Sequence, residues 1–206
     1  MDKKQILNDL IKEMRRDQDL PLRKGATNLV LGEGNLSAGV MFIGEAPGYH
    51  EDKEGRPFVG AAGKFLDQLL LSIKLPREDV FISNVICYRP PENRDPSPEE
   101  ISAFQPYIDR LIELIKPTVI VTLGRFSMGK FLPGVKITSV HGKPYVVNWK
   151  GKEIIVIPMY HPAAGLRRQE MKYALYEDFK KVPEAMKKIE EEKVKEQNKV
   201  EQMQLV

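Results

Sequence analysis

The stretch VMFIGEAPGYHEDKEGRPFVG (residues 40–60) begins as a continuous apolar run and changes abruptly at Gly44 into a turn of glycine, proline and carboxylate residues. A short apolar run bounded by turn residues is typical of a strand buried on both faces. Three further runs repeat the pattern: DVFISNV (79–85), TVIVTLG (118–124) and EIIVIPMY (153–160). The sequence therefore predicts four buried strands.

Helical segments separate these strands, at about 61–73, 98–115 and 125–132, with further helices at 3–16 and from about 172 onward. The 98–115 helix has a clear start, because Ser97, Pro98 and Glu100 form a capping-box pattern. Buried strands that alternate with helices predict an α/β fold, a three-layer α/β/α sandwich with a central, mainly parallel four-stranded sheet. We also expect a short strand at 29–31 and a hairpin strand within 139–149.

The chain of 206 residues, 42% of them hydrophobic, suits one compact domain over residues 1–180. Residues 181–206 are charged and read as a helical C-terminal extension. No apolar run is long enough to span a bilayer and no export signal is recognisable, so we expect a cytoplasmic protein without a membrane segment. The single cysteine, Cys87, excludes an internal disulfide.

Parallel sheets bind ligands beyond the carboxyl ends of their strands. The four predicted strands end in Gly44, Asn84, Gly124 and, within PMYHPAAGLRR (158–168), His161. Each residue by itself also fits an ordinary turn, but their convergence at one edge indicates a binding site. GAAGK (60–64) is not a phosphate loop, because Phe58 and Phe65 stand where that pattern requires glycine and Ser or Thr. With three histidines and one cysteine, we predict no metal site.

Six stretches together resemble the family 4 uracil-DNA glycosylases of bacteria and archaea. They cover residues 30–180 in order: GEGN (32–35), MFIGEAPGYHED (41–52), GRPFVGAAGKFLD (55–67), SNVICYRPPENRDPSPEE (83–100), LIKPTVIVTLGR (114–125) and YHPAAGLRR (160–168). The resemblance implies a monofunctional DNA-repair glycosylase that flips uracil out of DNA and hydrolyses its bond to the sugar. Uracil-containing DNA, single- or double-stranded, would then be the partner of a monomer associated with the nucleoid.

The resemblance also implies roles for pocket residues. Phe58 would stack on the flipped base, and Asn84 would pair with the uracil edge. Glu51 would exclude the methyl group of thymine, and the turn that begins at Gly44 would position the base. His161 would stabilise negative charge on the leaving uracil. Glu45 would orient water or steady the sugar cation, although better-known relatives have an aspartate one residue later, at the position of Ala46.

For DNA contact, the resemblance implies that Leu166 wedges into the gap left by the flipped base. Basic side chains would hold the flanking phosphates: Arg167, Arg168, Lys64, Arg94 and Arg125. Each of these charges fits a solvated surface equally well.

The sequence departs from the family at its iron–sulfur cluster, which four cysteines ordinarily hold. The corresponding positions are Asp17, Leu20, Tyr88 and Phe104, and Cys87 lies one residue away from the third. We therefore predict that the cluster is absent and that no cofactor is bound. Apolar packing of Leu20, Tyr88 and Phe104 would fill the space.

Two alternatives stay open beside the uracil-DNA glycosylase hypothesis. The same fold could act on another deaminated base, hypoxanthine or xanthine. It could also bind uracil-containing DNA without turnover, but relatives with that property carry a basic insertion before the third core strand that this sequence lacks.

Overall fold

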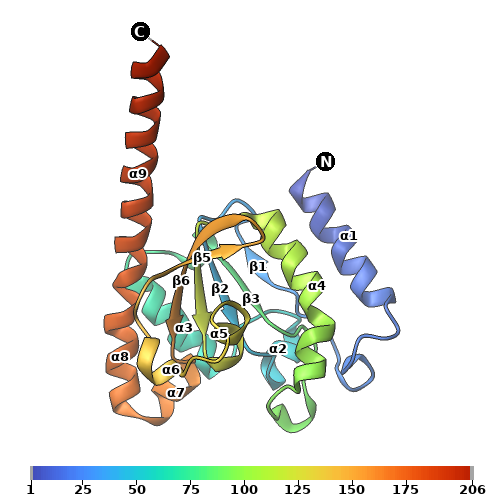
Figure 1. Ribbon diagram of the computed structural model, residues 1–206. Coiled ribbons are helices and arrows are strands. Elements are labelled where there is room, and N and C mark those ends of the chain that lie inside the picture. Colours follow the sequence, from blue (N-terminus) through green and yellow to red (C-terminus); the bar gives the residue numbers. More distant parts are fainter. Residues whose placement is uncertain (1, 205–206) are drawn as a thin grey trace.

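The computed structural model describes the backbone of residues 2–204 and the side chains of residues 2–192, 194 and 195 (Figure 1). In this part of the chain, six strands form one sheet in the order β1-β3-β2-β4-β6-β5. Their bounds are β1 (Glu33–Gly34), β2 (Val40–Gly44), β3 (Phe81–Asn84), β4 (Val119–Leu123), β5 (Tyr145–Trp149) and β6 (Lys152–Met159).

The four predicted core strands are confirmed, because β3, β2, β4 and β6 pair in parallel. The predicted number of strands is wrong, since antiparallel β1 and β5 add one strand at each edge. Residues 29–31 are buried but form no strand, and the edge strand lies at Glu33–Gly34 instead. Within the predicted 139–149 hairpin, β5 is the strand, whereas residues 137–140 form a short helix.

The α-helices are α1 (Lys3–Arg16), α2 (Tyr49–Glu54), α3 (Ala61–Ser72), α4 (Pro98–Ile115), α5 (Arg125–Phe131), α6 (Ile137–Val140), α7 (Pro162–Arg167), α8 (Gln169–Phe179) and α9 (Lys181–Gln204). The predicted helices begin within about three residues of these bounds, but the helix expected from about 172 onward is divided into α8 and α9, and α2, α6 and α7 were not predicted. The capping box that starts α4 is confirmed. Ser97 Oγ accepts a hydrogen bond from the Glu100 backbone N–H at 3.2 Å, and the Glu100 carboxylate accepts one from Ser97 N–H at 2.8 Å.

Helices cover both faces of the sheet (Figure 1). Alternate residues of β2 explain this, since Met41 and Ile43 point into one core and Val40 and Phe42 into the other. The first core packs α1 and α4 against the sheet, and the second packs α3, α8 and the start of α9.

The last helix, α9, leaves the body of the molecule and extends well beyond the sheet (Figure 1). Its first turns still belong to the packed core, because Val182 and Ala185 are buried there. None of the helices in the described residues combines the length and apolar composition that crossing a membrane requires.

Candidate functional site

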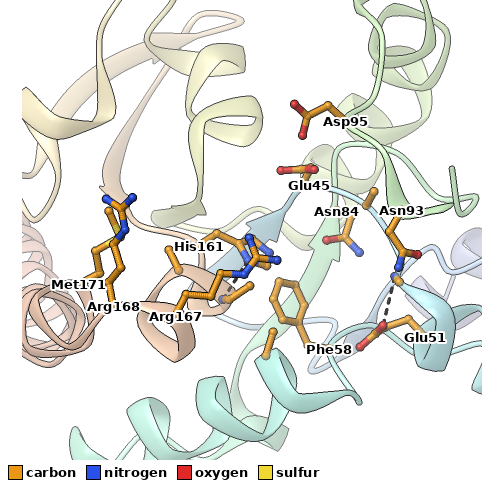
Figure 2. A pocket seen from close by; sticks show the side chains of 15 residues that line it. Glu45, Glu51, Phe58, Asn84, Asn93, Asp95, His161, Arg167, Arg168 and Met171 are labelled. Atoms are coloured by element: carbon orange, nitrogen blue, oxygen red, sulfur yellow. Dashed lines mark hydrogen bonds between the residues drawn. The ribbon is translucent and has the colours of Figure 1, made fainter. Parts of the chain in front are cut away.

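A cavity of about 680 Å³ opens beyond the carboxyl ends of the parallel strands (Figure 2). The chain continues from β2 to its neighbour β3 on one side, and from β4 toward β6 on the other side of the sheet. Parallel sheets bind ligands where neighbouring connections diverge in this way. Three separate parts of the chain line the cavity: Glu45, Ala46, Gly48, Glu51, Phe58 and Ala62; Asn84, Asn93 and Asp95; His161, Ala163, Ala164, Arg167, Arg168 and Met171.

Asn84, the last residue of β3, lines this cavity. Only 1% of the residue is exposed, and its carbonyl oxygen Oδ1 has no hydrogen-bond partner among the described residues. A buried polar atom without a partner costs roughly 1–3 kcal/mol, so native structures keep few of them. The described residues hold one other, Thr122 Oγ1, which does not line the cavity. Asn84 therefore brings to the cavity wall a carboxamide whose buried oxygen has no partner among the described residues.

Gly44 ends β2 directly beside Asn84, and the Phe58 ring lies against it. A Cβ atom on Gly44 would lie 2.5 Å from Cζ of Phe58 and would also overlap Asn84 Oδ1. Gly44 does not itself line the cavity, but only glycine allows these two side chains to approach so closely.

Phe58 has an unusual backbone conformation, with a φ angle of 52°. The left-handed region costs a residue with a side chain about 1–2 kcal/mol. The Phe58 ring stacks near His161, with ring centroids 5.7 Å apart and 28° between the planes (Figure 2). Thus a flat aromatic face, an unpaired amide oxygen and an imidazole surround one space.

His161 is the N-cap residue of α7, and its Nδ1 accepts a hydrogen bond from the Ala163 backbone N–H at 3.2 Å. In a neutral imidazole the proton must then be on Nε2. Burial lowers the pKa of His161 to about 4, with an opposing effect from Glu51. At neutral pH, His161 is therefore an uncharged ring whose Nε2–H is available as a donor.

Glu45 follows β2 and lies on the wall of the cavity near Asp95 (Figure 2). Burial raises the pKa of the Glu45 carboxyl, the negative charge of Asp95 raises it further, and Arg125 acts in the opposite direction. Arg125 forms an exposed ion pair with Asp95. Together these groups control how readily Glu45 carries its charge.

Glu51 lines the cavity but is also bound to the backbone around it. Its Oε2 accepts a hydrogen bond from Gly48 N–H at 3.1 Å, and its Oε1 accepts from Val59 and Gly60 N–H at 2.9 and 2.8 Å. Three backbone donors thus fix the carboxylate in the cavity wall.

The predicted DNA-contact residues separate into two groups. Arg167 and Arg168 line the cavity, Arg167 extends toward His161 in Figure 2, and Leu166 is half-exposed on the same short helix. Lys64 and Arg125 do not line the cavity, and both are exposed.

Arg94, another predicted phosphate contact, is bound to Glu100 at 2.6 and 2.8 Å. Sequence reasoning missed Asn93, Asp95 and Met171 as cavity residues. The first two lie in RPPENRDP (89–96), whose prolines and polar residues shortly after a strand were the available signal.

The side chains at the four cysteine positions do not fit an iron–sulfur cluster, which needs several thiolates where this chain has a single cysteine. As predicted, Leu20, Tyr88 and Phe104 are buried in one apolar cluster, and the Tyr88 and Phe104 rings lie 6.0 Å apart. Asp17 accepts a hydrogen bond from Tyr107 at 2.6 Å. No group of three His, Cys, Asp or Glu side chains suited to a metal occurs among the described residues.

Comparison with known proteins gives an independent result. Residues 31–187 match the model of the uracil DNA glycosylase superfamily. The chain is 55% identical over 166 residues to a type-4 uracil-DNA glycosylase of Sulfurisphaera tokodaii, which covers 77% of this chain and 74% of that protein. It is 47% identical over 183 residues to the type-4 enzyme of Archaeoglobus fulgidus (86% and 92%) and 49% identical over 180 residues to that of Saccharolobus solfataricus (84% and 83%).

Proposed function

The chain belongs to the uracil-DNA glycosylase superfamily, among its type-4 members, and on this premise we propose that it excises uracil from DNA. It hydrolyses the bond between the sugar and N1 of the base, leaves an abasic site and so begins base-excision repair. The observation that carries the proposal is the convergence of Phe58, Asn84 and His161 on one cavity, in a chain about half identical to enzymes of that name.

Recognition of the base follows from the unpaired Asn84 carboxamide. Its Oδ1 accepts a hydrogen bond from uracil N3–H, and its amide donates one to O4. Cytosine presents an acceptor at N3 and a donor at the 4-position, so it would leave both groups unpaired, which costs far more than a lost contact. The Phe58 ring stacks on the base with little loss of conformational entropy.

Catalysis requires groups that stabilise charge separation as the bond breaks. The departing uracil carries negative charge on O2. The Nε2–H of neutral His161 is a donor in a partly buried site, where such a hydrogen bond is stronger than in water. Because the low pKa keeps the ring uncharged, His161 stabilises the anion without full proton transfer.

Two carboxylates have different tasks in this proposal. Glu45 orients the attacking water or steadies the sugar cation, and its position on the cavity wall near Asp95 supports this role. Glu51 is fixed by three backbone donors and so presents a rigid wall. A rigid wall beside C5 of the base would exclude the methyl group of thymine.

DNA binding uses the surface around α7. Leu166 enters the gap left by the flipped base, and Arg167 and Arg168 bind flanking phosphates. Lys64 and Arg125 are exposed residues outside the cavity lining, and Arg125 is paired with the lining residue Asp95, so both would contact phosphates beside those held by α7. We also propose that the protein is a cytoplasmic, nucleoid-associated monomer, with a glycosylase domain at 1–180 and a helical extension at 181–206.

A gel assay of abasic-site formation on U·G and U·A duplexes tests the proposal. Wild type should cleave both, and His161→Ala should lose about 10²–10³-fold in rate, as expected when one donor to a developing anion is removed. Asn84→Asp removes the amide donor to O4 and adds a repelling charge, and it should be at least as damaging. Two variants that cleave as fast as wild type would show that these assignments are wrong.

Oligonucleotides that carry hypoxanthine or xanthine in place of uracil distinguish the alternative substrates. Preferential cleavage of either would replace uracil as the substrate. A complex with uracil-containing DNA that resists a denaturing gel, without turnover, would support the binding protein instead.

A further inference from the structure

The GEGN segment (32–35) contributes nothing to the cavity lining, yet its glutamate is the centre of a network of ion pairs. Glu33 lies in the two-residue edge strand β1, opposite Ile82. Gly34 has a φ angle of 123°, and a Cβ atom there would overlap the carbonyl oxygen of Val80. The glycine therefore lets β1 pack closely against β3 and brings the Glu33 carboxylate to the edge of the sheet.

Glu33 binds two arginines from different parts of the chain. Arg77 donates from Nε and Nη2 to Glu33 Oε1 at 2.9 and 2.7 Å, and Arg56 donates from Nε to Oε2 at 2.7 Å. The side chains of Arg77 and Glu33 are only 20% and 23% exposed. Burial acts to raise the pKa of Glu33, but the hydrogen bonds from Arg56 and Arg77 outweigh it and hold the pKa below its usual value. The carboxylate therefore stays charged and keeps Arg77 in place.

Arg77 also reaches the loop that carries Phe58. Its Nη2 donates to the carbonyl oxygen of Pro57 at 2.6 Å. On the other side of Phe58, the N–H groups of Val59 and Gly60 donate to Glu51. The peptide groups before and after Phe58 are thus each held by a charged side chain: the first by Arg77, outside the cavity, and the second by Glu51, in the cavity wall.

Phe58 needs this support because its left-handed backbone is a strained conformation for a residue with a side chain. Such conformations persist only where the surroundings hold them. If the Pro57 carbonyl were released, the residue could relax to an extended backbone, and its ring would leave the place between Gly44 and His161.

We propose that Arg77, anchored by Glu33, is a positioning residue that holds Phe58 in the backbone conformation required for stacking on the flipped base. This inference rests on the proposed glycosylase function and extends it to residues outside the cavity. Arg77 touches no substrate and acts only through Phe58. Since small displacements in an active site commonly cost about 10²-fold in rate, loss of Arg77 should slow cleavage about 10- to 100-fold.

A double-mutant cycle tests the inference with single-turnover cleavage of uracil-containing DNA at saturating enzyme. Arg77→Met should slow wild type by that factor, but should slow a Phe58→Ala enzyme less than about 3-fold, because the group that Arg77 positions is already missing. Equal losses in both backgrounds would overturn the inference, since a general structural role is independent of the Phe58 ring.

Asp67→Asn is the matched control. Asp67 accepts a hydrogen bond from Nη1 of the same arginine at 2.8 Å, but its side chain is 49% exposed and, among the described residues, makes no hydrogen bond to residues 55–60. The rate of this variant should stay within about 2-fold of wild type. If Arg77→Met does not fold, Glu33→Gln, which removes the charge that anchors Arg77, replaces it in the cycle.

Amide hydrogen exchange over residues 55–60 separates this inference from the proposed function. Arg77→Met should speed exchange there and Asp67→Asn should not. A wild-type protein that fails to cleave uracil-containing DNA defeats the proposed function, whereas unchanged exchange in Arg77→Met defeats the inference in either case.

Discussion

One segment of chain joins the cavity to the apolar cluster around Tyr88, but the two regions differ in how well their groups are packed and paired. Residues 84–97 begin at Asn84 in the cavity, pass through the cluster at Cys87 and Tyr88, and return to the cavity at Asn93. The cavity keeps an unpaired amide oxygen and a strained phenylalanine backbone. The cluster is closely packed, and burial raises the pKa of the Cys87 thiol so that it stays protonated.

This contrast shows in which region the residue types can change while the fold is kept. The cavity must present unsatisfied groups to a ligand, so its stability is limited by its task. The cluster only has to hold loops together, and apolar burial can do this where the family ordinarily uses four thiolates and a metal cluster. Substitutions in the cluster should therefore change stability, and substitutions in the cavity should change chemistry.

The largest effect should come from Phe104→Ala in the cluster. Phe104 is fully buried in α4 and packs against Tyr88. Truncation should cost about 3–5 kcal/mol in the free energy of unfolding, because it removes apolar contacts and leaves a hole. Urea unfolding measures the loss, and single-turnover cleavage per folded molecule should stay within a few-fold of wild type.

Leu71→Ala is the control for that experiment, since Leu71 is an apolar side chain that is 77% exposed. Its cost should be within about 0.5 kcal/mol. A folded Phe104→Ala protein that cleaves more than tenfold slower would contradict the separation of the two regions, because it would mean that the cluster takes part in shaping the cavity.

A somewhat smaller change in the free energy of unfolding is expected when the pH is lowered. The pKa of His161 falls from 6.5 to about 4 on folding, so the folded protein resists binding a proton that the unfolded chain accepts. The stabilisation is fully present above about pH 6.5 and is lost as the pH falls toward 4, by about 3 kcal/mol in total. Urea unfolding of wild type and His161→Ala at pH 7 and 4.5 isolates this part, because the other titrating groups cancel in the difference.

The two proteins should therefore differ in how steeply acid destabilises them, with wild type the more sensitive. Parallel pH dependences would mean that the folded protein protonates His161 as easily as the unfolded chain does. The same low pKa predicts that cleavage by wild type persists well below pH 6.5.

Most of the fold was accessible from the sequence because the core strands are continuous apolar runs. The four parallel strands and the capping box at Ser97 are local patterns, and both are confirmed. The edge strand β1 could not be predicted, because a strand of two residues is too short to show an alternating apolar pattern. The short helix α2 was missed for a related reason, because it lies in a polar segment without an apolar face.

The cavity was accessible only in part. Strand ends predict that Asn84 and His161 meet, because topology alone brings them together. What the sequence could not give is the state of each group: the proton on His161, the missing partner of Asn84 or the backbone of Phe58. These depend on burial and on contacts between residues far apart in the chain, such as Arg77 and Pro57.

Gly44→Ala should reduce activity by about 10²-fold, equal to about 2.7 kcal/mol in the transition state. The added methyl group would displace the Phe58 ring and the Asn84 oxygen by collision. Cleavage rates at saturating enzyme measure the effect. Gly129→Ala is the control, because a Cβ atom there meets nothing within 4 Å and alanine favours the surrounding helix.

The Gly44 variant tests whether the close approach of Phe58 and Asn84 matters for cleavage. Equal damage from the two alanines would mean that Gly44 matters only for the chain's general stability. A Gly44→Ala protein with wild-type cleavage would show that the base does not occupy the space beside Phe58 and Asn84.

The smallest effect should come from Ser97→Ala, at the point where the joining segment leaves the cavity and α4 begins. The substitution removes the acceptor for the Glu100 backbone N–H and should cost about 1 kcal/mol in unfolding free energy. The Glu100 carboxylate still accepts the N–H of residue 97 and still binds Arg94, so part of the cap remains. Ser97→Asp, which preserves a side-chain acceptor, should cost less than alanine.

The direction of the Ser97 result matters more than its size. The helix that it caps carries Phe104 into the cluster, while Asn93 and Asp95, shortly before it, line the cavity. If the two regions are independent, Ser97→Ala lowers stability and leaves cleavage per folded molecule unchanged. Slower cleavage with unchanged stability would mean that the cap positions Asp95, whose charge acts on Glu45. The start of α4 would then belong to the cavity region and not to the cluster.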